Sequence, residues 1–198
     1  MNKRYPIIIA YGFPCIIGVI SLCLMEWHVG GIIQTSGGIK ITDMYVKIGI
    51  NRINFDGYYG IYTEHSTYSL RSMDTHARVS AEFKNDWKKI YQVSSGVIAS
   101  FVAAFVFSFL VFFRKFFYLF AILPSIFYWI AIISYLVVSD NVNKIIFNDK
   151  NAMFPIYIDT QISNQKEIKI AMSVYLAIGT GLLSILSYII AIRLHRKG

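Results

Sequence analysis

The sequence predicts an α-helical integral membrane protein, in which a four-transmembrane-helix bundle carries a small extracellular antiparallel β-sheet. Three observations lead to this class. First, 56% of the 198 residues are hydrophobic and only 15% are charged, which is more apolar than a typical soluble domain. Second, the apolar residues gather in four blocks, at 7–25, 93–113, 116–138 and 171–192. Third, part of the polar stretch after the first block alternates apolar and polar residues with a period of two, as strands do.

Each apolar block is long enough, at about 1.5 Å per residue, to cross a hydrocarbon core of about 30 Å. None of the four contains Asp, Glu, Lys, Arg or His. In a soluble chain of this length, four such helices would leave too little polar surface. We therefore predict a single tetraspan domain over residues 1–198, with outer loops at 26–92 and 139–170.

The charges predict the orientation of these helices. Seven basic residues and no acidic residue lie before the first block, between the second and third, and after the fourth: Lys3, Arg4, Arg114, Lys115, Arg193, Arg196 and Lys197. All eleven acidic residues lie in the two long loops. Because basic residues favour the cytoplasmic side, we expect cytoplasmic termini and a multi-pass protein of the plasma membrane. The basic residues follow the membrane ends, so we expect no nucleic-acid partner.

The first block is expected to stay in the protein as a helix. It is long for the core of a signal peptide, and no small-residue cleavage site follows it. Within it, Ala10, Pro14 and Gly18 recur every four residues and predict a narrow face for close helix packing. Trp27 follows the block, where an aromatic anchor at the membrane interface belongs.

The outer loop 26–92 predicts a meander of about four antiparallel strands, with one face packed on the helices and one in water. The expected parts are a strand at Val29–Thr35, a turn at Ser36-Gly37-Gly38, an alternating strand over 44–51 that continues to a turn at Asp56-Gly57, and a hairpin about His65-Ser66 that joins Tyr58–Glu64 to Thr67–Arg71. In the second loop, Ile156 and Ile158 alternate with polar residues. They predict a fifth strand over 154–160 that pairs with the same sheet.

An amphipathic helix is predicted from Thr75, with Asp74 or Thr75 as its N-cap. The reason is that Val79, Phe83 and Trp87 recur every four residues with charged residues between them. This helix should lead into the second apolar block.

The second apolar block has a small face and an aromatic face. Small residues at four-residue spacing predict helix packing in this block, at Ser100, Ala104 and Ser108, and in the fourth block, at Ser173, Ala177 and Gly181. We assign Phe101, Phe105 and Phe109 to a surface that faces lipid or a protein partner. The sequence leaves both occupants open.

The residues of common enzyme classes are missing from the expected places, so we expect no enzyme, no cofactor and no metal. The apolar blocks hold no ionisable residue to mark a proton or ion route. Cys15 and Cys23 lie about 12 Å apart along one helix, too far to bridge. His65 and His76 are interpreted as polar loop residues rather than metal ligands, because no cysteine or third ligand accompanies them.

The run Tyr58-Tyr59-Gly60-Ile61-Tyr62 is the strongest candidate for a contact surface. Tyrosines bury a large area at a low cost in conformational entropy, and they are enriched where proteins meet. The alternative is that these rings pack the sheet onto the membrane surface. The sequence does not choose between the two.

The organisation resembles the claudin-like tetraspan superfamily, which includes claudins and gamma-type auxiliary subunits of ion channels. Trp27 stands where the family has a tryptophan, and Gly60-Ile61-Tyr62 is similar to its glycine–leucine–tryptophan triplet. The family's two first-loop cysteines are absent, with His65 near the first position, so the chain looks like a divergent member without that disulfide. The segment 141–147 is similar to the start of the second loop in claudins. The resemblance implies a sheet of first-loop strands plus one second-loop strand.

These observations predict a non-catalytic membrane interaction protein, most similar to an accessory subunit of an ion channel or receptor. The alternatives are a claudin-like cell–cell contact or barrier protein, and a small membrane enzyme with a site at Glu64, His65, Asp74 and His76. Partners would be membrane lipid and other membrane proteins, or further copies of the chain. The predicted partner-binding residues are Tyr58, Tyr59, Ile61, Tyr62, Asn143, Phe147, Phe101, Phe105 and Phe109.

Overall fold

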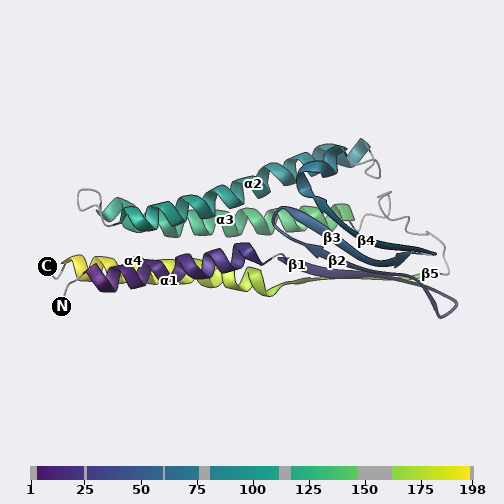
Figure 1. Cartoon of the computed structure of the whole chain (residues 1–198), viewed down its shortest axis with the longest axis horizontal. Coiled ribbons are helices and arrows are strands. Elements are labelled where there is room, and N and C mark those ends of the chain that lie inside the picture. The colour runs from purple at the N-terminus through teal and green to yellow at the C-terminus, as the bar shows by residue number, and fades with distance from the viewer. Residues whose placement is uncertain are drawn as a thin grey trace. The chain divides into compact units, whose positions relative to one another are not determined.

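A computed structural model describes residues 4–24, 26–59, 61–75, 81–111, 117–146 and 162–196 (Figure 1). The chain forms two compact units. The helical unit comprises Met1–Leu24, Gly96–Tyr135 and Met172–Gly198, and the sheet unit comprises Met25–Ser95 and Leu136–Ala171.

In the described ranges, four helices are long and apolar enough to cross a membrane, as the four apolar blocks predicted. They are α1 (Arg4–Cys23), α2 (Ala81–Leu110), α3 (Phe117–Ile146) and α4 (Met172–Arg196). The predicted span over 116–138 agrees with the apolar stretch Phe117–Val138, whereas the helix α3 itself continues past residue 138 to Ile146, through part of the expected loop. Apolar composition marks the stretch that can cross a membrane, whereas a helix can continue into polar sequence beyond it.

Helices α1 and α4 pack closely in the helical unit, and the small-residue face of α4 is confirmed. The buried residues of α4 are mostly small: Ser173, Val174, Ala177, Thr180, Gly181, Ser184, Ser187 and Ala191. Two of them link the helices by hydrogen bonds. The carbonyl of Ser173 accepts from the Ser21 hydroxyl at 2.8 Å, and the Ser187 hydroxyl donates to the carbonyl of Ala10. Small side chains allow this approach, and their hydroxyls add polar links.

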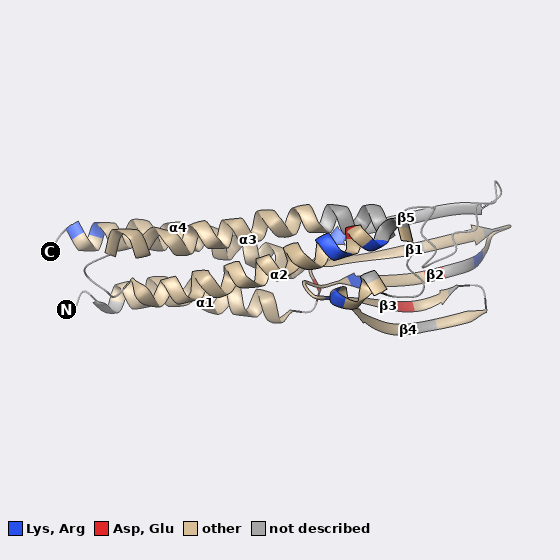
Figure 2. Cartoon of the chain, turned by 90° about the horizontal axis from the view of Figure 1, so that it is seen from above, with Lys and Arg blue, Asp and Glu red and all other residues tan. Residues whose placement is uncertain are grey.

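The other two helices complete a four-helix arrangement, in which α1 lies beside α4 and α2 lies beside α3 (Figures 1 and 2). The rings of Phe107 and Phe127 stack between α2 and α3, with centroids 5.3 Å apart. The Tyr11 hydroxyl of α1 donates to the carbonyl of Ala121 in α3 at 2.8 Å. In the described part of this unit, Figure 2 shows Lys and Arg colour at the end of α4 and none along the middle of the helices.

The sheet is antiparallel throughout, with strand order β4-β3-β2-β1-β5. The first four strands form the predicted meander: β1 (His28–Ser36), β2 (Ile39–Ile48), β3 (Arg52–Tyr59) and β4 (Tyr62–Ser69). The expected turn at Gly37 and Gly38 is confirmed. Both have positive φ, 56° and 81°, as a two-residue hairpin turn requires.

Two predicted turns are wrong. Gly57 lies inside β3, where it pairs with Met44 and has a φ of 147°. Residues 65 and 66 lie inside β4. The β3–β4 turn lies instead between Tyr59 and Tyr62, which form the last pair of the two strands. Gly57 was interpreted as part of a turn, whereas its lack of a side chain permits a close approach of β2 and β3.

The described sheet has a fifth strand, but this strand lies at residues other than the predicted 154–160. β5 is Ile162–Ile170, and it pairs with β1 from Ser36–Ile162 to His28–Ile170. Residues 154–160 lie outside the described part of the chain. β5 was missed because its sequence, ISNQKEIKI, is mostly polar and has little of the apolar alternation that indicates a strand.

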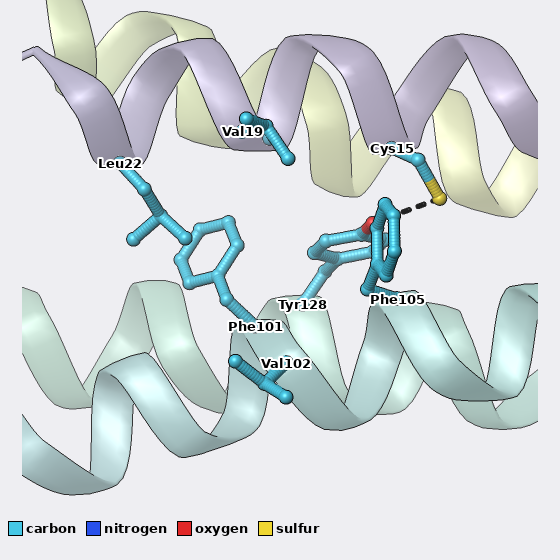
Figure 3. A pocket seen from close by; sticks show the side chains of 8 residues that line it. Cys15, Val19, Leu22, Phe101, Val102, Phe105 and Tyr128 are labelled. Carbon is cyan, nitrogen blue, oxygen red and sulfur yellow. Dashed lines mark hydrogen bonds between the residues drawn. The ribbon is translucent and has the colours of Figure 1, made fainter.

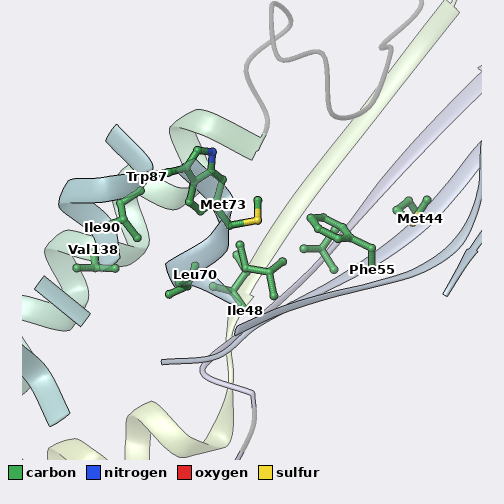
Figure 4. Close-up of a cluster of buried hydrophobic side chains, with 10 residues drawn as sticks. Met44, Ile48, Phe55, Leu70, Met73, Trp87, Ile90 and Val138 are labelled. Carbon is green, nitrogen blue, oxygen red and sulfur yellow. The ribbon is translucent and has the colours of Figure 1, made fainter. Parts of the chain in front are cut away.

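The core of the sheet unit confirms the alternating pattern of β2. Buried side chains come from one face of the sheet, from the 3₁₀ helix η1 (Leu70–Thr75), and from parts of α2 and α3: Met44, Val46, Ile48, Ile53, Phe55, Leu70, Met73, Trp87, Ile90 and Val138 (Figure 4). Asp74 and Thr75, the predicted N-cap residues, end η1, and residues 76–80, which separate them from the described start of α2 at Ala81, lie outside the described part of the chain.

Trp27 is fully buried in the sheet unit rather than placed as an exposed interfacial anchor. Its backbone N–H donates to the carbonyl of Ile48 at 2.9 Å, and its carbonyl accepts from the N–H of Ala171 at 2.8 Å. Trp27 therefore extends the pairing of β1 with both neighbouring strands by one residue.

Candidate interaction site

Two hairpin turns lie at the same end of the sheet. The β1–β2 turn lies between Ser36 and Ile39, and the β3–β4 turn follows Tyr59, which pairs with Thr42 near the start of β2. The other end of the sheet holds His28 and Ile170, from which the chain continues toward α1 and α4.

Large apolar side chains are exposed at this hairpin end. Ile39 is 71% exposed, Ile61 is 91% exposed and Tyr62 is 62% exposed. Tyr58 is also exposed on the adjoining strand. We call Ile39, Tyr58, Ile61 and Tyr62 the tip surface. Large apolar side chains exposed at one end of a sheet are candidates for a binding surface.

The tip surface contains three of the predicted contact residues and one that was missed. Tyr58, Ile61 and Tyr62 lie in the β3–β4 hairpin, whose turn falls inside the run that had been assigned to one strand. Tyr59 ends β3, where its backbone pairs with Tyr62, and its side chain is not described. Ile39 was missed, although a single large apolar residue directly after a two-glycine turn could have indicated it.

The sheet face opposite the core carries charged residues that pair with one another. Asp56 and His65 are cross-strand partners whose side chains approach to 2.5 Å. The Lys40 ammonium lies 2.9 Å from Asp43, and this hydrogen bond raises the pKa of Lys40.

Lys47 lies on the same face and has two partners. It forms an ion pair with Glu26, and that hydrogen bond raises the pKa of Lys47. Its ammonium also lies 5.5 Å from the centre of the Tyr45 ring. These pairs agree with a face that meets water.

The structure does not describe the four residues of the alternative catalytic site as one group. His65 pairs with Asp56, while His76 lies outside the described residues. The side chains of Glu64 and Asp74 are likewise not described. Within the described ranges, no group of three His, Cys, Asp or Glu residues could hold a metal ion.

A buried histidine of the sheet was also missed by the sequence analysis. His28 lies on the core side of β1, and burial lowers its pKa below the ordinary value of 6.5. Gln34, six residues along the same face, is buried as well. Residues an even number of positions apart lie on the same face of a strand, so His28 and Gln34 could have been placed together. Because both side chains are polar, the sequence did not indicate that this face is buried.

The predicted aromatic surface of α2 is wrong for Phe101. This side chain is buried in the helical unit and lies edge-on to the Tyr128 ring, with centroids 5.6 Å apart. It belongs to the buried stripe of α2 that includes Val97 and Ala104. Phe105 and Phe109 are exposed, as predicted, and contact each other at 5.0 Å.

The two second-loop candidates give no side-chain geometry. Asn143 lies in α3, in a stretch where only the backbone is described, and Phe147 lies outside the described residues.

The fold defines a class of chain: four helices long and apolar enough to cross a membrane, with a small antiparallel sheet of five strands. No protein-family model matches the sequence. No protein of curated function matches it either. The function is therefore inferred from the described surfaces.

Proposed function

We propose that this chain is a non-catalytic membrane protein that crosses the plasma membrane four times and acts as an accessory subunit of a larger complex, such as an ion channel or receptor. The observation that carries this proposal is the tip surface. Ile39, Ile61 and Tyr62 expose large apolar side chains on two hairpins at one end of the sheet. A protein partner that covers them would remove this apolar area from water, which is favourable.

The charge distribution supports the orientation of the proposed subunit. The described end of α4 carries Arg193 and Arg196 in its last turn. In the sequence, the helical unit holds no acidic residue, whereas all acidic residues lie in the sheet unit. By the positive-inside rule this distribution supports cytoplasmic termini and a tip surface outside the cell.

Site-specific photo-crosslinking tests the proposal. A benzophenone side chain at position 61 is compared with the same group at Thr67, which is exposed on β4 but lies away from the tip surface. Cells are irradiated, and the crosslinked protein is identified after gentle solubilisation. We expect a crosslink from position 61 to another membrane protein, and its loss when Ile39→Asp is added. Equal products from positions 61 and 67 would contradict the proposal.

A cell–cell contact role is the second candidate, and the place of the turns favours it. Both hairpin turns lie at the sheet end opposite to the one that continues into α1 and α4. In cells that lack natural adhesion, two populations with different tags should then enrich the protein where they touch. Ile61→Asp should abolish this enrichment. A uniform distribution over the cell surface would argue against the contact role.

A further inference from the structure

The helical unit contains a pocket between α1, α2 and α3 (Figure 3). Its volume is about 170 Å³. Cys15, Val19 and Leu22 of α1 line one side, and Phe101 and Phe105 of α2 line the other. The wall is almost entirely apolar.

A glycine leaves the room for this pocket. A Cβ on Gly18 would lie 3.4 Å from Cε1 of Tyr128 and 3.6 Å from Cε1 of Phe101, both in the pocket wall. The close approach of α1 to α4 at this point depends on the same glycine, since that Cβ would lie 3.3 Å from Cγ2 of Thr180. The bundle therefore packs tightly on one side of Gly18 and leaves a space on the other.

The polar atoms in the wall are already paired. The Tyr128 hydroxyl donates to Sγ of Cys15 at 3.6 Å, within the range of a hydrogen bond to sulfur (Figure 3). The edge of Phe101 also contacts the Tyr128 ring. A polar ligand would have to break this pair or remain without a partner, which is unfavourable in an apolar setting.

The mouth of the pocket is continuous with an exposed apolar surface. Val19, Val102 and Phe105 line the pocket and are also exposed. Their neighbours Ile20 and Val106 are exposed as well, and all five lie in segments long and apolar enough to cross a membrane. In a bilayer, the molecules that reach such a surface at this depth are lipid chains.

We propose that this pocket binds a segment of the acyl chain of a bilayer phospholipid. The inference rests on the membrane insertion that is part of the proposed function. The size is suitable, because a cavity of about 150 Å³ lined by Leu, Ile and Phe can bind benzene. A short segment of an acyl chain is apolar like benzene and can bend to follow the pocket wall.

The stabilisation comes from packing rather than from water. Lipid tails are as apolar as leucine, so moving a chain segment from bilayer to pocket has little hydrophobic driving force. An empty pocket, however, forfeits the dispersion contacts of all its wall atoms. The aromatic rings of Phe101, Phe105 and Tyr128 supply those contacts when the pocket is filled.

The structure offers two matched pairs of variants. Val19 and Ile20 are adjacent and are 46% and 47% exposed, but only Val19 lines the pocket. Val102 and Val106 form the same comparison on α2, with 54% and 48% exposed. Tryptophan at Val19 or Val102 should fill the pocket, whereas tryptophan at Ile20 or Val106 should change only the outer surface.

The test is photolabelling of the full chain in phosphatidylcholine vesicles whose acyl chains carry a diazirine. Labelled residues are mapped by mass spectrometry. We expect labels concentrated on the pocket-lining residues of α1 and α2, with a several-fold loss in Val19→Trp and no loss in Ile20→Trp. If Val19→Trp does not fold, Val102→Trp and Val106→Trp provide the same comparison.

Three outcomes would overturn the pocket proposal. They are an even spread of labels over all exposed apolar residues, equal labelling of Val19→Trp and Ile20→Trp, and displacement of the label by a sterol but not by added phospholipid. Flotation of the chain with vesicles after an alkaline wash separates this failure from that of membrane insertion. A chain that does not float overturns both proposals, and one that floats with even labelling overturns the pocket alone.

Discussion

Gly57 of β3 lies directly across from Met44 of β2, and the two backbones approach closely enough to leave no room for a side chain at Gly57. A Cβ there would lie 2.1 Å from the Asp43 carbonyl oxygen and 2.9 Å from the Met44 Cα. The backbone φ of 147° is also one that residues with a side chain rarely adopt.

Gly57→Ala should therefore destabilise the sheet unit strongly. Backbone strain costs about 1–3 kcal/mol, and forced displacement of packed atoms costs about as much again. We expect a loss of more than about 3 kcal/mol in the free energy of unfolding. Hydrogen exchange of the β2 and β3 amides in detergent would measure it. The matched control is Gly31→Ala in β1, whose Cβ would meet its nearest atom, the Met44 carbonyl oxygen, at an ordinary 3.7 Å. Equal protection in the two variants would refute the steric explanation.

Trp87 anchors α2 in the core of the sheet unit, and its ring and its N–H should contribute differently. The side chain is fully buried, and its Nε1 has no hydrogen-bond partner among the described residues. Trp87→Ala should cost about 3–5 kcal/mol, because it opens a large cavity. Trp87→Phe should cost less than about 2 kcal/mol, since most of the ring remains and an unpaired donor is removed. Denaturant unfolding of both variants checks this. Equal losses of stability in the two variants would show that the Trp87 N–H has a hydrogen-bond partner that contributes to stability.

The buried His28 predicts a loss of stability in acid. Because burial lowers its pKa in the folded chain, the unfolded chain takes up a proton at this position first as the pH falls below 6.5. The contribution of His28 to the free energy of unfolding should be constant above pH 6.5. Below pH 6.5 this contribution should fall until the pH passes the lowered pKa of His28. Unfolding of the wild type and of His28→Gln is compared from about pH 8 to about pH 5. The variant should lose less stability over this range, and parallel curves would exclude His28 as the cause.

The serine hydroxyls between α1 and α4 should each contribute a small, additive stabilisation. Ser21 bonds the carbonyl of Ser173, and Ser187 bonds the carbonyl of Ala10, at well-separated positions along the pair. Each change to alanine should cost about 0.6 kcal/mol, and at most about 1.7. The double variant should cost the sum. Thermal unfolding in detergent measures these values. Ser95→Ala is the control, because Ser95 is exposed and bonds only the Tyr91 carbonyl of its own helix. A comparable loss in Ser95→Ala would mean that the interhelical bonds are not the cause.

The helices and the meander could be predicted because each leaves a strong signal in the order of apolar and polar residues. A span-length helix needs an unbroken apolar block, and the inner face of a half-buried strand needs every second residue apolar, as at Met44, Val46 and Ile48. Element ends carry a weaker signal. Asn143 belongs to a helix that had been expected to end at residue 138, because polar sequence does not distinguish a helix that leaves a membrane from a loop.

Two errors arose from residue types that serve more than one structural purpose. Gly57 was expected in a turn, but its lack of a side chain serves a close strand contact. Phe101 was placed on a lipid or partner surface because it is large and apolar, yet it packs inside the helical unit against Tyr128. Of the candidate contact residues, Tyr58, Tyr59 and Tyr62 were chosen because three tyrosines within five residues stand out in a polar loop, and Ile61 was chosen because it lies among them. Ile39 stands alone after a two-glycine turn, which is a weaker signal that the choice did not use.

The pairing of β5 with β1 has a consequence for how the protein is made. Strands β1 to β4 are joined by short turns and can pair as soon as residue 69 has left the ribosome. β5 is synthesised far later, after α2 and α3. Until then, the edge of β1 that will bind β5 is open, and open edges attract strands of other chains. The nascent protein therefore has a vulnerable period during synthesis, which ends when β5 pairs with β1 just before the last helix is made.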